Sequence, residues 1–148
     1  EACKGMPVQL VITRGGGDSP AHDESLPPSA VVVDYAPQLE LLERASLAIT
    51  HGSVNTVVES LSHGVPLIAI PLVFDQPGTA ARLQRTGAGI AMSLKQARTS
   101  RLRSAIAMML ENPSYVEAAD RMRNACMEGG GVEKAVDIIE SVTTVEGA

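Results

Sequence analysis

Thr50-His51-Gly52-Ser53-Val54-Asn55-Thr56-Val57-Val58-Glu59 joins a short apolar run, residues 47–50, to an amphipathic run, residues 54–63. The first run is typical of a buried strand, and the second repeats apolar residues at the period of a helix. We therefore predict a strand that turns at His51-Gly52 directly into a helix. The start of such a helix directs unpaired backbone N–H groups and the positive end of its dipole at one point, which favours binding of a phosphate or diphosphate.

The alternation of strand and helix continues on both sides of this junction. A surface loop is expected from Arg14 to Ser29, which includes Gly15-Gly16-Gly17, and a short helix from Pro37. The sequence His63-Gly64-Val65-Pro66 is a helix stop. The expected strands are residues 8–13, 30–33, 47–50, 67–70 and 89–92; the expected helices include residues 54–63, with Val54, Val57, Val58 and Leu61 on one face, residues 76–85, and the segments after residue 99. This order predicts an α/β fold, a Rossmann-like parallel sheet flanked by helices, with ligands at the carboxyl ends of the strands.

Composition narrows the class of protein. With 148 residues the chain has the size of one domain, and its core must be aliphatic because Phe74, Tyr35 and Tyr115 are its only aromatic residues. A net charge of −5, without a basic stripe, argues against a nucleic-acid surface. Cys3 and Cys126 have neither metal-site spacing nor a disulfide framework, which indicates a reducing, cytoplasmic setting. No signal peptide or transmembrane segment is expected, and the start without Met suggests a fragment of a larger protein.

Polar residues at the expected strand ends are the candidate ligand-binding residues, and each has a structural alternative. His51 could donate to a phosphate oxygen where Gly52 lets the backbone approach, or both could simply form a strand–helix corner. Asn55 and Glu59 share one helix face, which could bind sugar hydroxyls or only face solvent.

Two further candidates follow other strands. Asp75 and Gln76 come after the apolar strand at residues 67–70, and Asp75 could instead be a helix cap. Tyr35 could stack on a nucleobase or be buried like most tyrosines.

The order of these motifs is more specific than any one of them. Tyr35-Ala36-Pro37-Gln38, Leu41-Leu42, the run from His51 to Glu59, Gly64-Val65-Pro66 and Asp75-Gln76 follow one another along the chain. This order resembles the donor-binding signature of UDP-dependent glycosyltransferases of the GT-B type, a family that includes macrolide and carotenoid glycosyltransferases. The resemblance extends from about residue 6 to about residue 142. It implies that residues 1–148 are a nucleotide-sugar donor-binding domain, the C-terminal half of a GT-B fold.

The resemblance also implies a role for each matching residue. Tyr35 would stack on the nucleobase, whose edge the Ala36 backbone would read; Gln38 and Glu59 would bind the ribose; His51, Gly52, Ser53, Asn55 and Thr56 would hold the diphosphate; Asp75 and Gln76 would bind the hexose, with Gln76 favouring glucose. The sequence departs from the family pattern at three positions. Tyr35 replaces a common Trp, Ser53 a common Gly, and Thr79 a frequent Asn. We expect Ser53 to have an ordinary φ and to cap the helix.

The implied reaction is an inverting, metal-independent displacement that transfers a hexose from a UDP-sugar, with UDP-glucose favoured, to a hydroxyl of a small-molecule acceptor. His51 and the helix start would stabilise the leaving diphosphate, and no cofactor is implied beyond the sugar donor. The family's general base lies in an N-terminal acceptor domain, and nothing here matches that domain. The first strand and helix of the donor domain are also unmatched, since Glu1 to Gly5 is similar to the end of that helix. We therefore expect the chain alone to bind donor without transferring sugar.

The sequence leaves three alternative functions open. The chain could be the donor-binding subunit of a split glycosyltransferase, with the acceptor site on a second polypeptide. It could be a non-catalytic module that binds nucleotide sugars. A UDP-sugar epimerase on a related fold is the third, although the order of motifs follows the transferase signature.

Overall fold

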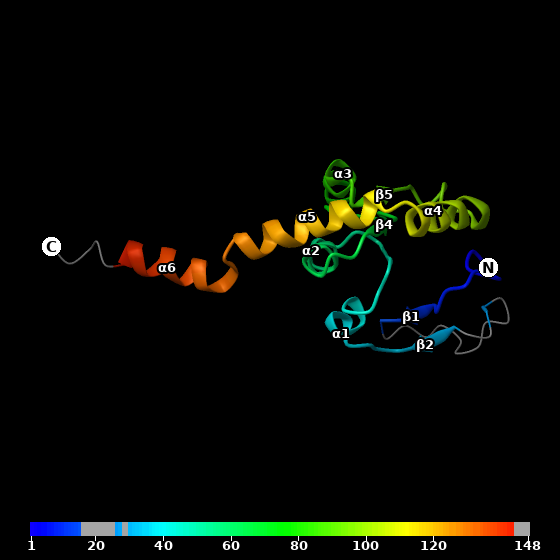
Figure 1. Ribbon diagram of the computed structural model, residues 1–148, viewed down its shortest axis with the longest axis horizontal. Helices are drawn as coiled ribbons and strands as arrows, with labels where there is room; N and C mark the ends of the chain where they lie inside the picture. Colours follow the sequence, from blue (N-terminus) through cyan, green and yellow to red (C-terminus); the bar gives the residue numbers. More distant parts are fainter. Residues whose placement is uncertain (16–25, 28–29, 144–148) are drawn as a thin grey trace.

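The computed structural model describes residues 1–15, 26–27 and 30–143. The expected alternation of strands and helices is confirmed, with strands up to three residues shorter than predicted (Figure 1). The loop expected at residues 14–29 lies mostly outside the described residues, including Gly16 and Gly17. The elements are β1 (Val11–Thr13), β2 (Val31–Val33), α1 (Gln38–Leu42), β3 (Ala48–Thr50), α2 (Val54–Ser62), β4 (Leu67–Ala69), α3 (Gln76–Thr86), β5 (Gly89–Ala91), α4 (Thr99–Glu111), α5 (Ser114–Glu128) and α6 (Gly131–Thr143).

The strands β3, β4 and β5 form a parallel sheet with β4 in the middle. All three residues of β4 are fully buried, because helices cover both faces of the sheet. Leu67 and Ala69 point to the side packed by α2, α3 and α5, whereas Ile68 points to the side packed by α4. This alternation explains why β4 is a continuous apolar run, as expected of a parallel strand with two buried faces.

The strands β1 and β2 form a second, separate parallel pair. Each sheet is thus parallel, as predicted, but the described strands are divided between two sheets. Within the described part of the chain, β1 and β3 each have a strand partner on one edge only, so no ladder of hydrogen bonds joins the two sheets. The valines of the pair are poorly covered: Val11 is 39% exposed and Val31 is 46% exposed.

The helix α2 ends where the sequence predicts. Gly64 adopts φ 73°, and the Val65 N–H donates to the Ser60 carbonyl at 2.9 Å, which closes the last turn. The buried face differs from the prediction, because it consists of Val57, Ser60 and Leu61, and both Val54 and Val58 are about half exposed. The Ser60 hydroxyl is accommodated by donating to the Thr56 carbonyl at 2.7 Å.

The helices after β5 differ in how much they bury. α4 packs on the sheet, and α5 crosses α2 and α3, whereas α6 extends away from the other elements and has no buried residue (Figure 1). Residues 2–5 form turns rather than a helix, and Arg103 of α4 donates to the carbonyls of Ala2 and Lys4 at 3.0 and 2.6 Å. Among the described ranges, no helix is both long enough and apolar enough to cross a membrane.

Candidate functional site

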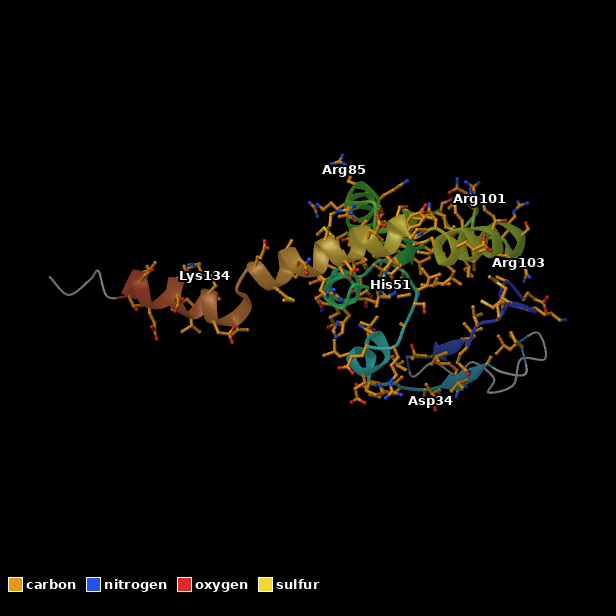
Figure 2. The ribbon with its side chains drawn as sticks, in the orientation of Figure 1. Asp34, His51, Arg85, Arg101, Arg103 and Lys134 are labelled. Atoms are coloured by element: carbon orange, nitrogen blue, oxygen red, sulfur yellow. The ribbon has the colours of Figure 1, made fainter. Side chains whose placement is uncertain are left out.

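The predicted site residues lie after the carboxyl ends of strands in both sheets or on the helices that follow them. Tyr35 and Ala36 follow β2, His51 and Gly52 follow β3, and Asp75 lies in the turn after β4. Because the strands are parallel, these segments leave each sheet at its carboxyl edge, where α/β proteins bind ligands. Figure 2 shows His51 close to α2, and its side chain is exposed.

The junction between β3 and α2 is the tight turn that the sequence predicts. Gly52 adopts φ 87°, a left-handed conformation that L side chains rarely adopt, and its N–H donates to the Thr50 hydroxyl at 3.2 Å. The first backbone bond of α2 runs from the Val57 N–H to the Ser53 carbonyl at 3.0 Å. The amides of residues 54–56 have no acceptor recorded in the described chain, so the start of α2 presents donors for an anion.

The side-chain cap expected of Ser53 and the cap considered as the alternative for Asp75 are both absent. Ser53 has an ordinary φ of −54°, as predicted, but its side chain makes no capping hydrogen bond, so the capping role was wrong. Asp75 precedes α3 in an αR conformation, and it too makes no side-chain cap. A residue in αR does not direct its side chain at the helix amides as an extended N-cap does. The structural alternative for Asp75 is therefore not supported, and its carboxylate is exposed.

The two residues assigned to the ribose meet directly. Gln38 at the start of α1 donates from its Nε2 to the Glu59 carboxylate on α2, across 21 positions of sequence. The helices α1 and α2 lie side by side (Figure 1). The Glu59 carboxylate keeps further acceptor capacity, since a carboxylate can accept several hydrogen bonds.

Tyr35 is 83% exposed, which rules out the alternative of a buried tyrosine. Sequence reasoning missed the ion pair beside it, between Arg14 after β1 and Asp34 after β2, whose place Figure 2 marks at Asp34. The Arg14 N–H also donates to the Val33 carbonyl at 3.0 Å. Both residues directly follow predicted strands, and opposite charges at paired strand ends are the signal that could have revealed them.

The residues assigned to the hexose lie next to the junction between β3 and α2. A Cβ built on Gly52 would lie 3.5 Å from the Gln76 carbonyl oxygen, so the two segments are in contact. The Gln76 side chain is bonded to its own turn, because its Oε1 accepts from the N–H groups of Leu72 and Val73 at 2.9 and 3.0 Å. Thr79 is buried, and its hydroxyl donates to the Asp75 carbonyl at 3.4 Å, so it faces its own helix.

Asn55 and Thr56 occupy the first turn of α2, where Asn55 is exposed and Thr56 is half-buried. Across the described ranges, no group of three or more His, Cys, Asp or Glu residues is placed to hold a metal ion. The amides at the start of α2 and the ring of His51 lie at this junction, where they could meet a negative charge.

Residues 8–140 match the family described as the erythromycin biosynthesis protein CIII-like C-terminal domain. The chain belongs to this family. This family, its curated relatives and the solved structures together confirm the resemblance to the C-terminal half of GT-B glycosyltransferases. A protein of Bacillus subtilis named as an uncharacterized UDP-glucosyltransferase is 34% identical over 96% of this chain and 35% of its own length. The zeaxanthin glucosyltransferase of Pantoea ananas is 36% identical over 96% of this chain and 33% of its own length.

Solved structures agree with the family. The calicheamicin glycosyltransferase CalG4 superposes with a TM-score of 0.90 at 26% identity, covering 99% of this chain and 38% of that one. A spinosyn rhamnosyltransferase complexed with thymidine diphosphate has a TM-score of 0.63 at 27% identity, covering 67% of this chain and 27% of that one. The chain thus spans about a third of the length of the curated relatives it matches.

Proposed function

We propose that this chain is the nucleotide-sugar donor-binding domain of a glycosyltransferase, and that it binds UDP-glucose for hexosyl transfer to a hydroxyl of a small-molecule acceptor. The observation that carries the proposal is the hydrogen bond between Gln38 and Glu59. Both residues are assigned to the ribose by the family signature, and they come from different helices. Family membership over residues 8–140 supports the same function.

Each group of the donor has a proposed partner along the carboxyl ends of the strands. The exposed ring of Tyr35 stacks on the uracil while the Ala36 backbone reads its edge, and Gln38 and Glu59 hold the ribose hydroxyls. His51 and the amides that begin α2, with the polar side chains of Ser53, Asn55 and Thr56, hold the diphosphate. Asp75 and Gln76 face the hexose.

The proposed reaction is a direct displacement at the anomeric carbon that inverts its configuration. An acceptor oxygen forms a bond to that carbon as the bond to the diphosphate oxygen breaks. The negative charge that develops on the leaving UDP is stabilised by the helix N-terminus and by His51, without a metal ion. The acceptor and the base that removes its proton are assigned to polypeptide beyond this chain. The chain alone is therefore expected to bind the donor without forming glycoside.

Calorimetry and thermal shift with UDP, dTDP and UDP-glucose test the proposal. A ligand present at about 100 times its Kd should stabilise the chain by about 2.7 kcal/mol. We expect UDP to bind more tightly than dTDP, because Glu59 accepts from the 2′-hydroxyl that dTDP lacks. Tighter binding of dTDP would contradict the assignment of the nucleotide, and binding of UDP that requires added Mg²⁺ would contradict the metal-independent diphosphate site.

His51→Ala tests the diphosphate site directly. Loss of one donor to the diphosphate should weaken UDP binding at least about tenfold, since a hydrogen bond to a charged group contributes about 1.5–3 kcal/mol. His63→Ala is the matched control, because His63 lies at the opposite end of the same helix, where its Nδ1 is 2.7 Å from the Glu59 carbonyl oxygen. Equal UDP affinity for His51→Ala and the unchanged chain would refute this role.

A further inference from the structure

The turn between β4 and α3, residues 70–75, is held by the side chain of the residue that follows it. The Gln76 Oε1 accepts from the Leu72 N–H at 2.9 Å and from the Val73 N–H at 3.0 Å. The Gln76 backbone N–H donates to the Val73 carbonyl at 3.3 Å. A carboxamide oxygen has two lone pairs, so both are used within the turn. Only the Nε2 group of Gln76 is left to donate to a ligand.

The turn holds its residues in a conformation that the chain would not adopt readily by itself. Phe74 has φ 56°, in the left-handed region that bulky residues avoid, and it is 92% exposed. Packing of the Phe74 ring therefore cannot keep the backbone in this conformation. The two hydrogen bonds to the Gln76 side chain flank the strained residue on its N-terminal side, and the backbone bond from the Gln76 N–H to the Val73 carbonyl spans it.

The same turn sets the direction of Asp75. Asp75 comes directly after Phe74 and is exposed, and no hydrogen bond or ion pair of its carboxylate is recorded within the described residues. Its backbone carbonyl accepts from the Thr79 N–H at 3.0 Å, which joins it to α3. The orientation of the carboxylate thus depends on the backbone of the turn before it and the helix after it.

Gln76 is also fixed against the diphosphate junction. Its carbonyl oxygen and its Cβ lie 3.5 and 3.9 Å from the position that a Cβ on Gly52 would take. One residue therefore contacts both segments of the candidate site, with its backbone toward the junction of β3 and α2 and its side-chain oxygen toward the turn after β4.

We propose that Gln76 is a positioning residue, whose carboxamide oxygen fixes the turn at residues 70–75 and thereby places the Asp75 carboxylate toward the hexose. Its effect on the sugar passes through the turn, and direct contact between Gln76 and the hexose is secondary. The consequence for the ligand rests on the proposed function. The consequence for the turn rests only on the hydrogen bonds of Gln76.

Amide hydrogen exchange tests the turn. Gln76→Ala removes the acceptor, so exchange at Leu72 and Val73 should become about tenfold faster, the ratio equivalent to about 1.4 kcal/mol. Gln76→Glu retains an oxygen that accepts from both N–H groups and removes the donor Nε2, so exchange should stay slow. The matched controls are Gln84→Ala and Gln84→Glu, since Gln84 is exposed on the same helix. Exchange at Leu72 and Val73 that does not change in Gln76→Ala would overturn the proposal.

Ligand preference tests the effect on the hexose. The ratio of the UDP Kd to the UDP-glucose Kd reports the contribution of the hexose. Because both ligands carry a diphosphate, the ratio removes most of the effect that the negative charge added by Gln76→Glu has on that group. We expect the ratio to fall at least about fivefold in Gln76→Ala and to recover in Gln76→Glu, as loss and retention of about one hydrogen bond predict. A ratio that falls equally in both variants would assign Gln76 to direct sugar contact through Nε2 and overturn the positioning role. If neither ligand binds the unchanged chain, the proposed function fails, whereas amide exchange still decides whether Gln76 positions the turn.

Discussion

The two parallel sheets differ in how firmly they hold the ends of the candidate site. Every residue of β4 is fully buried, and helices pack on both faces of the sheet that contains it. No residue of β1 or β2 belongs to either buried apolar cluster of the described chain, and Val11 and Val31 are substantially exposed. The residues proposed to bind the diphosphate and the hexose extend from the packed sheet, whereas Tyr35 extends from the sparsely packed pair.

This difference indicates how the proposed donor site would be organised. A group held by a close-packed core is fixed before the ligand arrives, and a rigid arrangement suits the reacting end of the donor, where charge develops. The nucleobase end needs only an exposed ring and a backbone edge. The side-chain hydrogen bond from Gln38 on α1 to Glu59 on α2 links these two ends.

The contrast in packing predicts the largest effect. Leu67→Ala deletes a fully buried side chain in the middle strand, so the free energy of unfolding should fall by about 2–5 kcal/mol. Val31→Ala in β2 should cost less than about 1 kcal/mol, because the side chain is already 46% exposed. Urea unfolding of the two variants measures both values. Similar losses would show that β1 and β2 are packed as firmly as the other sheet.

The two ends of α2 provide the next comparison. Gly52 and Gly64 both have positive φ, so replacing either with Ala should cost about 1–3 kcal/mol of stability. For Gly64→Ala a clash adds to the strain, since the new Cβ would lie 2.8 Å from Asp120 Oδ1. Only Gly52→Ala should also weaken UDP binding, which calorimetry would show. Gly78→Ala is the control, because no atom lies within 4 Å of its new Cβ. Equal UDP affinity in both variants would place the diphosphate elsewhere.

The hydrogen bond between Gln38 and Glu59, which links the nucleobase end of the proposed site to its diphosphate end, predicts a smaller effect. Glu59→Gln keeps an oxygen that can accept from Gln38 but removes the charge that strengthens hydrogen bonds to ribose hydroxyls. UDP should bind about tenfold more weakly, a loss of about 1.4 kcal/mol. The advantage of UDP over deoxyuridine diphosphate should shrink, because these two ligands differ only at the 2′-hydroxyl. Glu40→Gln on the neighbouring helix α1 makes the same change of charge at an exposed position and should alter neither affinity.

Local patterns predicted the elements well and their wider pairing poorly. The boundary after Ser62 follows from Gly64 and Pro66, whose backbone preferences act over a few residues. The division into two sheets depends on which strand edges meet in space, and three-residue strands carry little information on that. At the site, the signature assigned Gln38 and Glu59 to the same group of the donor, and the structure places their side chains in hydrogen-bond contact. The signature could not show that the side-chain oxygen of Gln76 accepts hydrogen bonds from its own turn, because that depends on the rotamer of this one side chain.

The turn after β4 predicts the smallest effect, and one of opposite sign. Phe74 has φ 56° and is 92% exposed, so Phe74→Gly relieves strain and removes almost no packing. A left-handed residue other than Gly costs about 1–2 kcal/mol, and the added freedom of Gly in the unfolded chain offsets part of this. The free energy of unfolding should therefore rise by up to about 1 kcal/mol, measured by urea unfolding. Leu72→Gly is the matched control: Leu72 is also exposed but has no positive φ, so the same replacement should lower stability. Phe74→Gly could instead lose as much stability as Leu72→Gly. That result would mean that the ring of Phe74 packs against the chain. Backbone strain would then no longer distinguish this turn from the other exposed loops.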